Sequence, residues 1–287
     1  MRNSNHTDAS CKPCSDVCVP GGVYLCQVND QVSCGACCGL YNVADTSRQA
    51  MAQMLKGRSR RFKAVPRTVS AIDAFAQHTQ MLENQDRPFP QFHHCPYIGL
   101  IGEHKGRVGC LLHPLAEGND GVDLRSLSYY GELACRTYFC PAIRELETRY
   151  KEILRSIFQD WHLYGLVVTE KDLINALFDL IERRLGCGLD ARNFSKNPAA
   201  AHALLDLLAL KFKWPYRPKH LNTPCHHFFF DVAYTKPAID YEALGIPPSQ
   251  YDLIFQELVS EFHNIPNLRA AEEILDQKVT TVVTTVQ

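Results

Sequence analysis

The sequence concentrates thiols in the stretch Cys34-Gly35-Ala36-Cys37-Cys38-Gly39, where three cysteines fall within five residues. Further cysteines lie on both sides, so that 11 of the 13 in the chain occur among the first 140 residues. Thiolates are soft metal ligands, and clustered cysteines seldom serve packing alone. The stretch therefore predicts a metal site.

The compartment decides whether such thiols form disulfides or bind metal. The N-terminus is polar and lacks the apolar run of a signal peptide. No stretch approaches the roughly 18 consecutive apolar residues of a membrane span. We therefore expect a cytoplasmic protein without a membrane segment, whose reduced cysteines act as metal ligands or reactive thiols. The formal net charge of −1 excludes a global field that would drive binding to nucleic acid or membrane.

Adjacent cysteines carry geometric information of their own. Cys37 and Cys38 project in different directions from the backbone, so that one mononuclear metal would use both with difficulty. Two neighbouring metal sites, or a polynuclear cluster, would use them more naturally. Because cysteine binds both metals, the expected cofactor is zinc or iron, the latter including an iron–sulfur cluster.

The later cysteines follow an ordered pattern. Cys95 precedes a proline, Cys110 stands shortly before His113, and the last two occur as Cys135-Arg136 and Cys140-Pro141. With Cys-x-x-Cys-Cys upstream, this order resembles the YkgJ-like cysteine-cluster family, a family of zinc- or iron-chelating proteins, over roughly residues 26–140. The resemblance implies that the metal ligands are Cys34, Cys37, Cys38, Cys95, Cys110, Cys135 and Cys140.

The eighth ligand is less defined. The family has a cysteine three or four residues before the position of Cys34, where this chain has Asp30 and Gln31. Cys26 is the nearest substitute and completes the predicted set of ligands. The alternatives are Cys18, Cys14 and Cys11.

A rival assignment uses the first predicted hairpin. Cys11-x2-Cys14 and Cys34-x2-Cys37 flank that hairpin, and paired Cys-x-x-Cys knuckles around a hairpin are typical of zinc ribbons. In a mixed arrangement, four cysteines would form a site of their own: Cys11, Cys14, Cys18 and Cys26.

Other side chains near the thiols are candidates for tuning or completing the site. Arg136 can donate hydrogen bonds to an anionic thiolate or iron–sulfur unit, and is our candidate cofactor-binding residue. His113 matches the family pattern. The histidines of His93-His94-Cys95 and Cys225-His226-His227 can also bind metal, although histidines beside aromatic runs are more often packed or surface residues. Cys187 and Cys225 are interpreted as buried small residues.

The elements that position these residues are predominantly helical. Apolar spacing predicts helices over 46–62 and 67–84, and short hairpins over 23–32 and 97–110. From Pro141, apolar residues at three- and four-residue steps predict one long amphipathic helix that reaches Trp161. Further helices are predicted over 169–185 with a capping box at Thr169, over 196–212, from a cap at Ser249 to 262, and near 267–277. Residues 280–287 are β-branched and are expected to fray or to add an edge strand.

We therefore predict a mainly α fold with small β-hairpins. A cysteine-rich, zinc- or iron-chelating N-terminal domain (1–140) would pack on a helical C-terminal domain (141–287). The two are expected to share one core, because Cys140 runs straight into the long helix.

Three functions fit these observations. The first is a metal-binding protein whose biological role is unassigned. Its partner is the metal ion or cluster, and the sequence indicates no protein partner. The second is an iron–sulfur-dependent enzyme of methyl transfer or redox chemistry, because the cysteine cluster is distantly similar to that of flagellin lysine N-methylases. No residue can be assigned to a methyl donor or a lysine substrate. The third is a nucleic-acid-associated module with structural zinc, which would use basic stretches at 48–67 and 211–219. The near-neutral net charge favours solvated faces as the explanation of these stretches.

Overall fold

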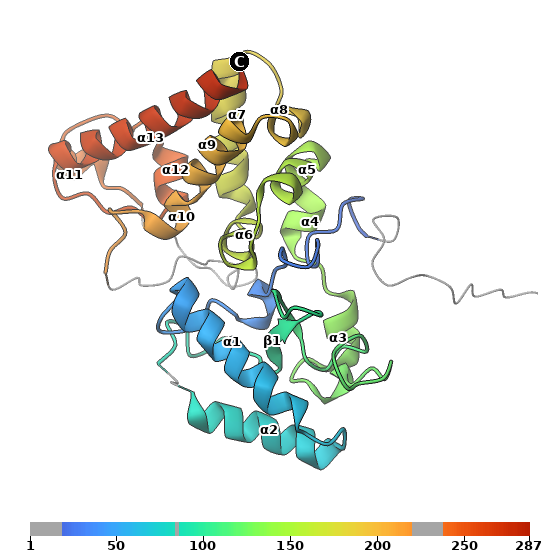
Figure 1. Ribbon diagram of the computed structural model, residues 1–287. Helices are drawn as coiled ribbons and strands as arrows, with labels where there is room; N and C mark the ends of the chain where they lie inside the picture. Colours follow the sequence, from blue (N-terminus) through green and yellow to red (C-terminus); the bar gives the residue numbers. More distant parts are fainter. Residues whose placement is uncertain (1–18, 84–85, 220–237) are drawn as a thin grey trace, which may run out of the picture.

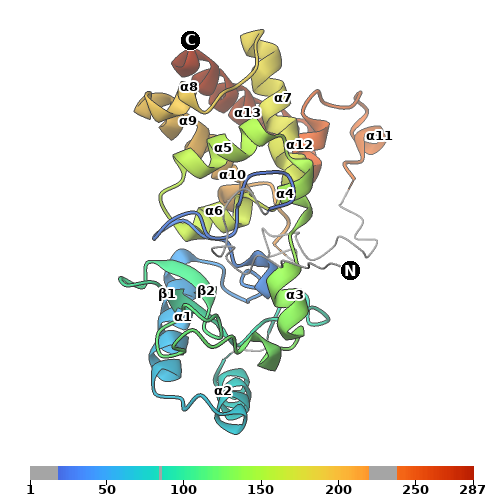
Figure 2. The ribbon, with the colours of Figure 1, turned by 90° about the vertical axis from the view of Figure 1, so that its right-hand side faces the viewer.

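The protein is described here by a computed structural model, which covers residues 19–83, 86–219 and 238–287. Figures 1 and 2 show two halves, one above the other in both views. The lower half holds the first elements, which are α1 (Arg48–Lys63), α2 (Val69–Leu82), β1 (Ile98–Ile101), β2 (Arg107–Cys110) and α3 (Gly131–Thr137). The predicted mainly α fold with a small antiparallel hairpin is confirmed.

The upper half consists of the helices that follow residue 140. They are α4 (Pro141–Glu145), α5 (Thr148–Ile157), α6 (Trp161–Val167), α7 (Lys171–Leu185), α8 (Arg192–Ser195), α9 (Pro198–Leu208), α10 (Leu210–Lys213), α11 (Tyr241–Leu244), α12 (Asp252–Glu257) and α13 (Ile265–Val286). Within the described ranges, no helix is long and apolar enough to cross a membrane.

The elements of the lower half begin where the sequence places them. The hydroxyl of Ser47 accepts a hydrogen bond from the Ala50 N–H at the start of α1, and Thr68 caps α2 in the same way. The hairpin predicted over 97–110 is present, with Ile98 paired to Cys110 in antiparallel register. Both early helices and this hairpin are therefore confirmed.

The hairpin predicted over 23–32 is reduced to one antiparallel bridge, between Gln27 and Ser33. The side chain of Asn29 closes the loop by accepting hydrogen bonds from the N–H groups of Gln31 and Val32. Regular strands do not extend from this loop, because Leu25 and its apolar neighbours are buried against the helices of the upper half. The prediction of two strands here is wrong.

The long helix predicted from Pro141 to Trp161 is also wrong in its continuity. The chain breaks into α4, α5 and α6, because Leu146 and Glu147 adopt extended backbone conformations between the first two helices. Asp160 then begins α6 by accepting hydrogen bonds from the N–H groups of two following residues. The apolar positions are nevertheless buried as predicted, since each short helix turns the same kind of face to the core.

The C-terminal segment is helical rather than frayed or extended. Val279, Val282 and Val283 are buried on one face of α13, which packs against α9. On the other side, threonine hydroxyls donate hydrogen bonds to carbonyls one turn earlier, as Thr284 does to Thr280. Tertiary packing therefore overrides the modest helix propensity of β-branched residues.

Two predicted caps are replaced by other contacts. At the start of α7 the cap position is Glu170, whose carboxylate forms a buried ion pair with Lys211, and the hydroxyl of Thr169 has no hydrogen-bond partner. At the start of α12 the cap position is Tyr251, and Ser249 instead donates a hydrogen bond to Glu272. Both helices are present, but Thr169 and Ser249 do not occupy their cap positions.

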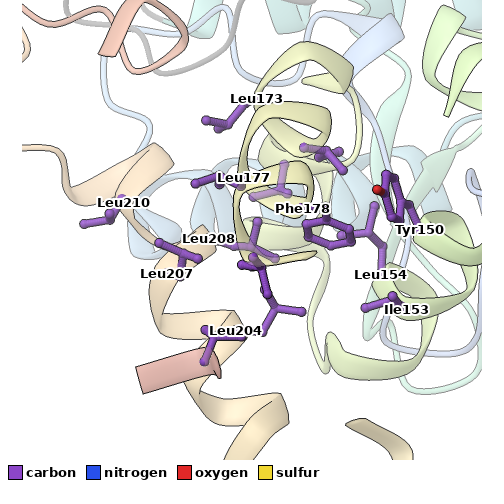
Figure 3. Packing of buried hydrophobic residues seen from close by; sticks show 14 of the residues in the cluster. Tyr150, Ile153, Leu154, Leu173, Leu177, Phe178, Leu204, Leu207, Leu208 and Leu210 are labelled. Atoms are coloured by element: carbon purple, nitrogen blue, oxygen red, sulfur yellow. The ribbon is translucent and has the colours of Figure 1, made fainter. Parts of the chain in front are cut away.

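The largest apolar cluster, which we call the helical core, lies in the upper half. There α5, α7, α9 and α13 pack together, and Figure 3 shows side chains from the first three. Phe178 of α7 packs edge-on against Tyr150 of α5, with ring centroids 4.7 Å apart. Val19, Val23 and Leu25, from the start of the described chain, belong to the same cluster.

Two smaller apolar clusters lie in the lower half and at its junction with the upper half. The described residues therefore form three apolar clusters rather than the one shared core that was predicted. The junction cluster joins α1 and the hairpin to Trp161 and Leu166 of α6. The hairpin cluster joins α2 to the hairpin ends and includes Phe75, Cys95 and Tyr97. Packing therefore crosses residue 140 in both directions, and the domain division at that residue stays a prediction.

The ion pair between Lys211 and Glu170 supports the upper half. The side chains are 0% and 4% exposed, and their Nζ and Oε2 atoms lie 2.9 Å apart. We expect Lys211→Met to lower the free energy of unfolding by about 3–5 kcal/mol, because it leaves a buried carboxylate without its cation. Denaturation in urea measures the change. The exposed Lys213 on the same short helix provides the control, and an equal loss in Lys213→Met would contradict this account.

Candidate metal centre

The motif Cys34–Gly39 forms a tight turn whose glycines are required by close contacts. Residues Ala36–Cys38 form a single 3-10 turn that ends at Gly39, which has a left-handed φ of 75°. A Cβ atom on Gly39 would lie 2.2 Å from the carbonyl oxygen of His93, and one on Gly35 would lie 2.5 Å from Ile98 Cδ1. Both glycines thus allow the thiol-bearing turn to approach the hairpin.

Backbone hydrogen bonds bring further cysteines to this turn. The Cys34 N–H donates to the carbonyl of Cys26 at 2.8 Å, and the Cys95 N–H donates to the carbonyl of Cys38 at 2.9 Å. Cys110 ends β2 and is paired with Ile98, which follows Cys95 by three residues. The fold therefore gathers cysteines that are more than 70 residues apart along the chain, such as Cys38 and Cys110.

One group of thiols, the first set, comprises Cys26, Cys34, Cys37 and Cys140. Burial raises the pKa of Cys34 well above its usual value, and negative charge on each of the other three would raise it further. Burial likewise raises the pKa of Cys140 to about 11, and charge on Cys37 contributes. The side chains of this set thus lie close enough to oppose one another's ionisation. Cys140 occupies the cap position of α4, as its place before Pro141 suggested.

The other group, the second set, comprises Cys38, Cys95, Cys110 and Cys135. Burial raises the pKa of Cys95 to about 11, and charge on Cys135 would raise it further. Burial also raises the pKa of Cys110, with contributions from Cys95 and Cys135. The pKa of Cys38 is raised first by its hydrogen bond with the Cys37 thiol, then by burial and by charge on Cys37, Cys95 and Cys110.

The two sets meet at the adjacent pair Cys37 and Cys38. The hydrogen bond between their thiols lowers the pKa of Cys37, so that Cys37 is the thiol of the pair that ionises more readily. All eight cysteines predicted as ligands, including Cys26, are thus brought together. Among the described residues, however, no three Cys, His, Asp or Glu side chains are arranged so that they would hold a metal ion.

Several candidates for the site cannot be placed. The rival ligands Cys11, Cys14 and Cys18, and the triplet Cys225-His226-His227, lie outside the described residues. The zinc-ribbon assignment and the mixed assignment therefore stay predictions. Cys187 is exposed rather than buried, because it follows the glycine that ends α7 and faces solvent.

A buried arginine supports the turn from behind. Arg58 of α1 is fully buried, and its guanidinium donates to the carbonyls of Cys95 and Ile98, at 2.9 and 3.3 Å, and to Glu83. His94 lies between this guanidinium and the carbonyl of Gly39, with its two ring nitrogens 2.6 and 2.7 Å from them. Burial and the nearby Arg58 lower the pKa of His94 to about 3, so that the ring is neutral at pH 7.

This network was missed in the sequence, where Arg58 counted only as part of a basic stretch. A signal was present in its place on the apolar face of a helix, next to the buried positions Leu55 and Phe62. Its role is to join the backbone before β1 to the backbone after the Cys-Cys pair. His93 and His94 are thus packed residues rather than members of a metal-binding group in this arrangement.

Several other basic side chains are also engaged within the chain. Arg61 contacts Glu83, Lys63 contacts Glu117, and Arg67 donates to Asn119. In the second basic stretch, Lys211 is buried, and Trp214 is buried with its indole N–H bonded to Ser260. These contacts engage part of each stretch within the chain, whereas Lys56, Arg60 and Lys213 are exposed.

Arg136 lies in ion pairs rather than against a thiol. Its side chain is 53% exposed and contacts Glu132 and Asp123. The arginine whose charge lowers the pKa of Cys110 is Arg125, which sequence reasoning did not single out. His113 is half-buried, and its Nδ1 accepts a hydrogen bond from the Leu115 N–H. Cofactor binding by Arg136 stays a prediction.

A scan against protein-family models, a search of curated proteins and a search of solved structures find no match to this chain. The similarity to the YkgJ-like family therefore rests on the order of the cysteines alone, and the function is argued from the arrangement of the site.

The Arg58 network generates a test of how the site is supported. We expect Arg58→Met to lower the free energy of unfolding by about 3 kcal/mol or more, because it removes the donor of the buried carbonyls of Cys95 and Ile98 and the buried cation beside Glu83. Arg60, an exposed arginine on the same helix, is the matched control, and Arg60→Met should change stability by about 0.5 kcal/mol or less. Urea denaturation of both variants decides, and equal effects would contradict the structural role of Arg58.

Proposed function

We propose that this chain is a metal-binding protein that holds zinc or an iron–sulfur unit through its cysteine cluster. The proposal is supported by the proximity of the predicted ligands: in each of the two sets, which meet at Cys37 and Cys38, charge on one thiol would raise the pKa of another. Four thiolates complete the coordination sphere of a structural zinc ion, and four cysteines hold the common iron–sulfur clusters.

The chemistry of the donors supports the same conclusion. Both sets consist of sulfur, the donor that favours zinc and iron–sulfur units over magnesium or calcium. The thiols interact without forming a ligand group, so that binding would draw them together and release their protons. Metal binding would then contribute directly to the stability of the fold, because the ligands come from both halves.

The two other candidate functions have less support from the residues of this chain. The second candidate, an iron–sulfur enzyme of methyl transfer or redox chemistry, has no residue assigned to a donor or substrate. The third, a nucleic-acid-associated module, loses support because several of its basic side chains are engaged in contacts within the chain. Metal binding is therefore the function that the site favours.

The proposal predicts the metal content of the purified protein. Protein prepared without oxygen should carry about two zinc ions per chain, or iron with acid-labile sulfide, as measured by mass spectrometry and a visible spectrum. Cys38→Ser and Cys34→Ser should each lower the metal content and the thermal stability, because each removes a ligand.

The exposed thiol of Cys187 lies outside both sets and provides the control. Cys187→Ser should keep the full metal content and stability. Metal-free wild-type protein, or a loss of metal in Cys187→Ser equal to that in Cys38→Ser, would refute the proposal.

A further inference from the structure

The helix α3 differs from α1, α2 and the hairpin because it buries none of its side chains. Its one large apolar residue, Leu133, is 77% exposed. A helix of seven residues is not stable by itself in water, since short isolated helices cannot repay the cost of nucleation. Something other than apolar packing must therefore hold α3 in place.

The polar contacts of α3 are weak supports. The ion pair of Arg136 with Glu132 lies within the helix, and its contact with Asp123 is longer, at 3.8 Å. The thiol of Cys135 lies 3.1 Å from the hydroxyl of Ser128, in the segment that leads into α3. Exposed ion pairs contribute little to stability, so that these contacts do not fix the helix against the hairpin.

One end of α3 has a pivot. Tyr129 and Tyr130, directly before the helix, pack on His93 with ring centroids 4.3 and 4.9 Å from its ring. Gly131 follows with a left-handed φ of 75°, and a Cβ atom there would meet no other atom within 4 Å. Cys135 follows four residues later, and charge on its thiol would raise the pKa of Cys95 and of Cys110.

The remaining thiols are held by packing. In the second set, Cys95 is buried in the hairpin cluster, and Cys38 and Cys110 pack against that cluster. In the first set, Cys26, Cys34 and Cys140 pack against the helical core. Cys135 belongs to neither cluster and is exposed. Each set therefore has three thiols fixed by apolar packing and a fourth that is exposed. In the first set the fourth thiol is Cys37, on the 3-10 turn that backbone hydrogen bonds from Cys38 and Gly39 close. In the second set it is Cys135, on a helix that buries none of its side chains.

We infer that the second set is an exchangeable metal site and that α3 is the element that opens it. This inference rests on the proposed function. Metal held by Cys38, Cys95, Cys110 and Cys135 would fix α3 against the hairpin, and its loss would release α3 about Gly131. Metal held by the first set would stay, because three of its ligands pack against the helical core and the fourth, Cys37, lies on the closed 3-10 turn.

Timed exposure of the intact protein to EDTA tests the inference. Metal content by mass spectrometry should fall in two phases, with the fast phase about ten-fold or more faster than the slow one. After the fast phase, hydrogen exchange should increase at residues 131–137, whereas residues 148–157 and 171–185 keep their protection.

Single variants separate the two sets. Cys135→Ser should lose the fast-phase metal and the protection of α3, but keep the remaining metal and the protection of residues 148–157 and 171–185. Cys140→Ser should lose slow-phase metal and lower the unfolding midpoint. Cys187→Ser is again the control.

The outcomes distinguish the two proposals. Wild-type protein without metal would refute the proposed function and this inference together. Bound metal that leaves in one phase, with loss of protection spread over the whole chain, would overturn this inference alone. Full metal content in Cys135→Ser, or an α3 that stays protected after the fast phase, would overturn it as well.

Discussion

The crowding of eight thiols at the junction of two halves is the constraint on which the rest of the arrangement depends. Burial raises the pKa of Cys34 and of Cys110, and the pKa of Cys38 is raised first by its hydrogen bond with Cys37 and then by burial. Many anionic sulfurs cannot share so desolvated a volume unless cations balance them. These three thiols therefore favour their protonated form, whereas Cys37 ionises more readily than Cys38.

Backbone contacts, rather than neighbouring positive charges, hold the thiol-bearing segments together. Gly39 permits the close approach of the turn to the His93 segment, and the Cys95 N–H binds the carbonyl of Cys38 directly. Behind them, Arg58 and His94 join the same two backbone segments through buried hydrogen bonds. The positions of Cys38 and Cys95 are therefore determined by main-chain geometry, and their side chains remain free to serve a ligand.

The site also explains how the two halves are joined. Val32 belongs to the helical core and Ala36 to the junction cluster, and Cys140 begins α4, so that Cys34 and Cys140 lie near the points where the chain passes between the halves. The junction cluster includes Trp161 and Leu166, which pack against α1 and the hairpin. Apolar packing therefore holds this interface, and each set has one exposed thiol, Cys37 in the first and Cys135 in the second.

The sequence by itself determined which donor chemistry is available, namely a concentration of thiols, and the local elements that present it. The order of the cysteines, through the resemblance to the YkgJ-like family, singled out the eight predicted ligands. Apolar periodicity identified α1, α2, α7 and the hairpin, because that signal depends on residues close in the chain. Only the tertiary structure decided where the long helix breaks, that residues 280–287 are helical, and that Arg58 is a buried support. Each depends on packing against segments far away in sequence: α13 on α9, and Arg58 on the backbone of the hairpin. The division of the thiols into two sets has the same origin, since partners such as Cys34 and Cys140 meet only when the two halves pack together.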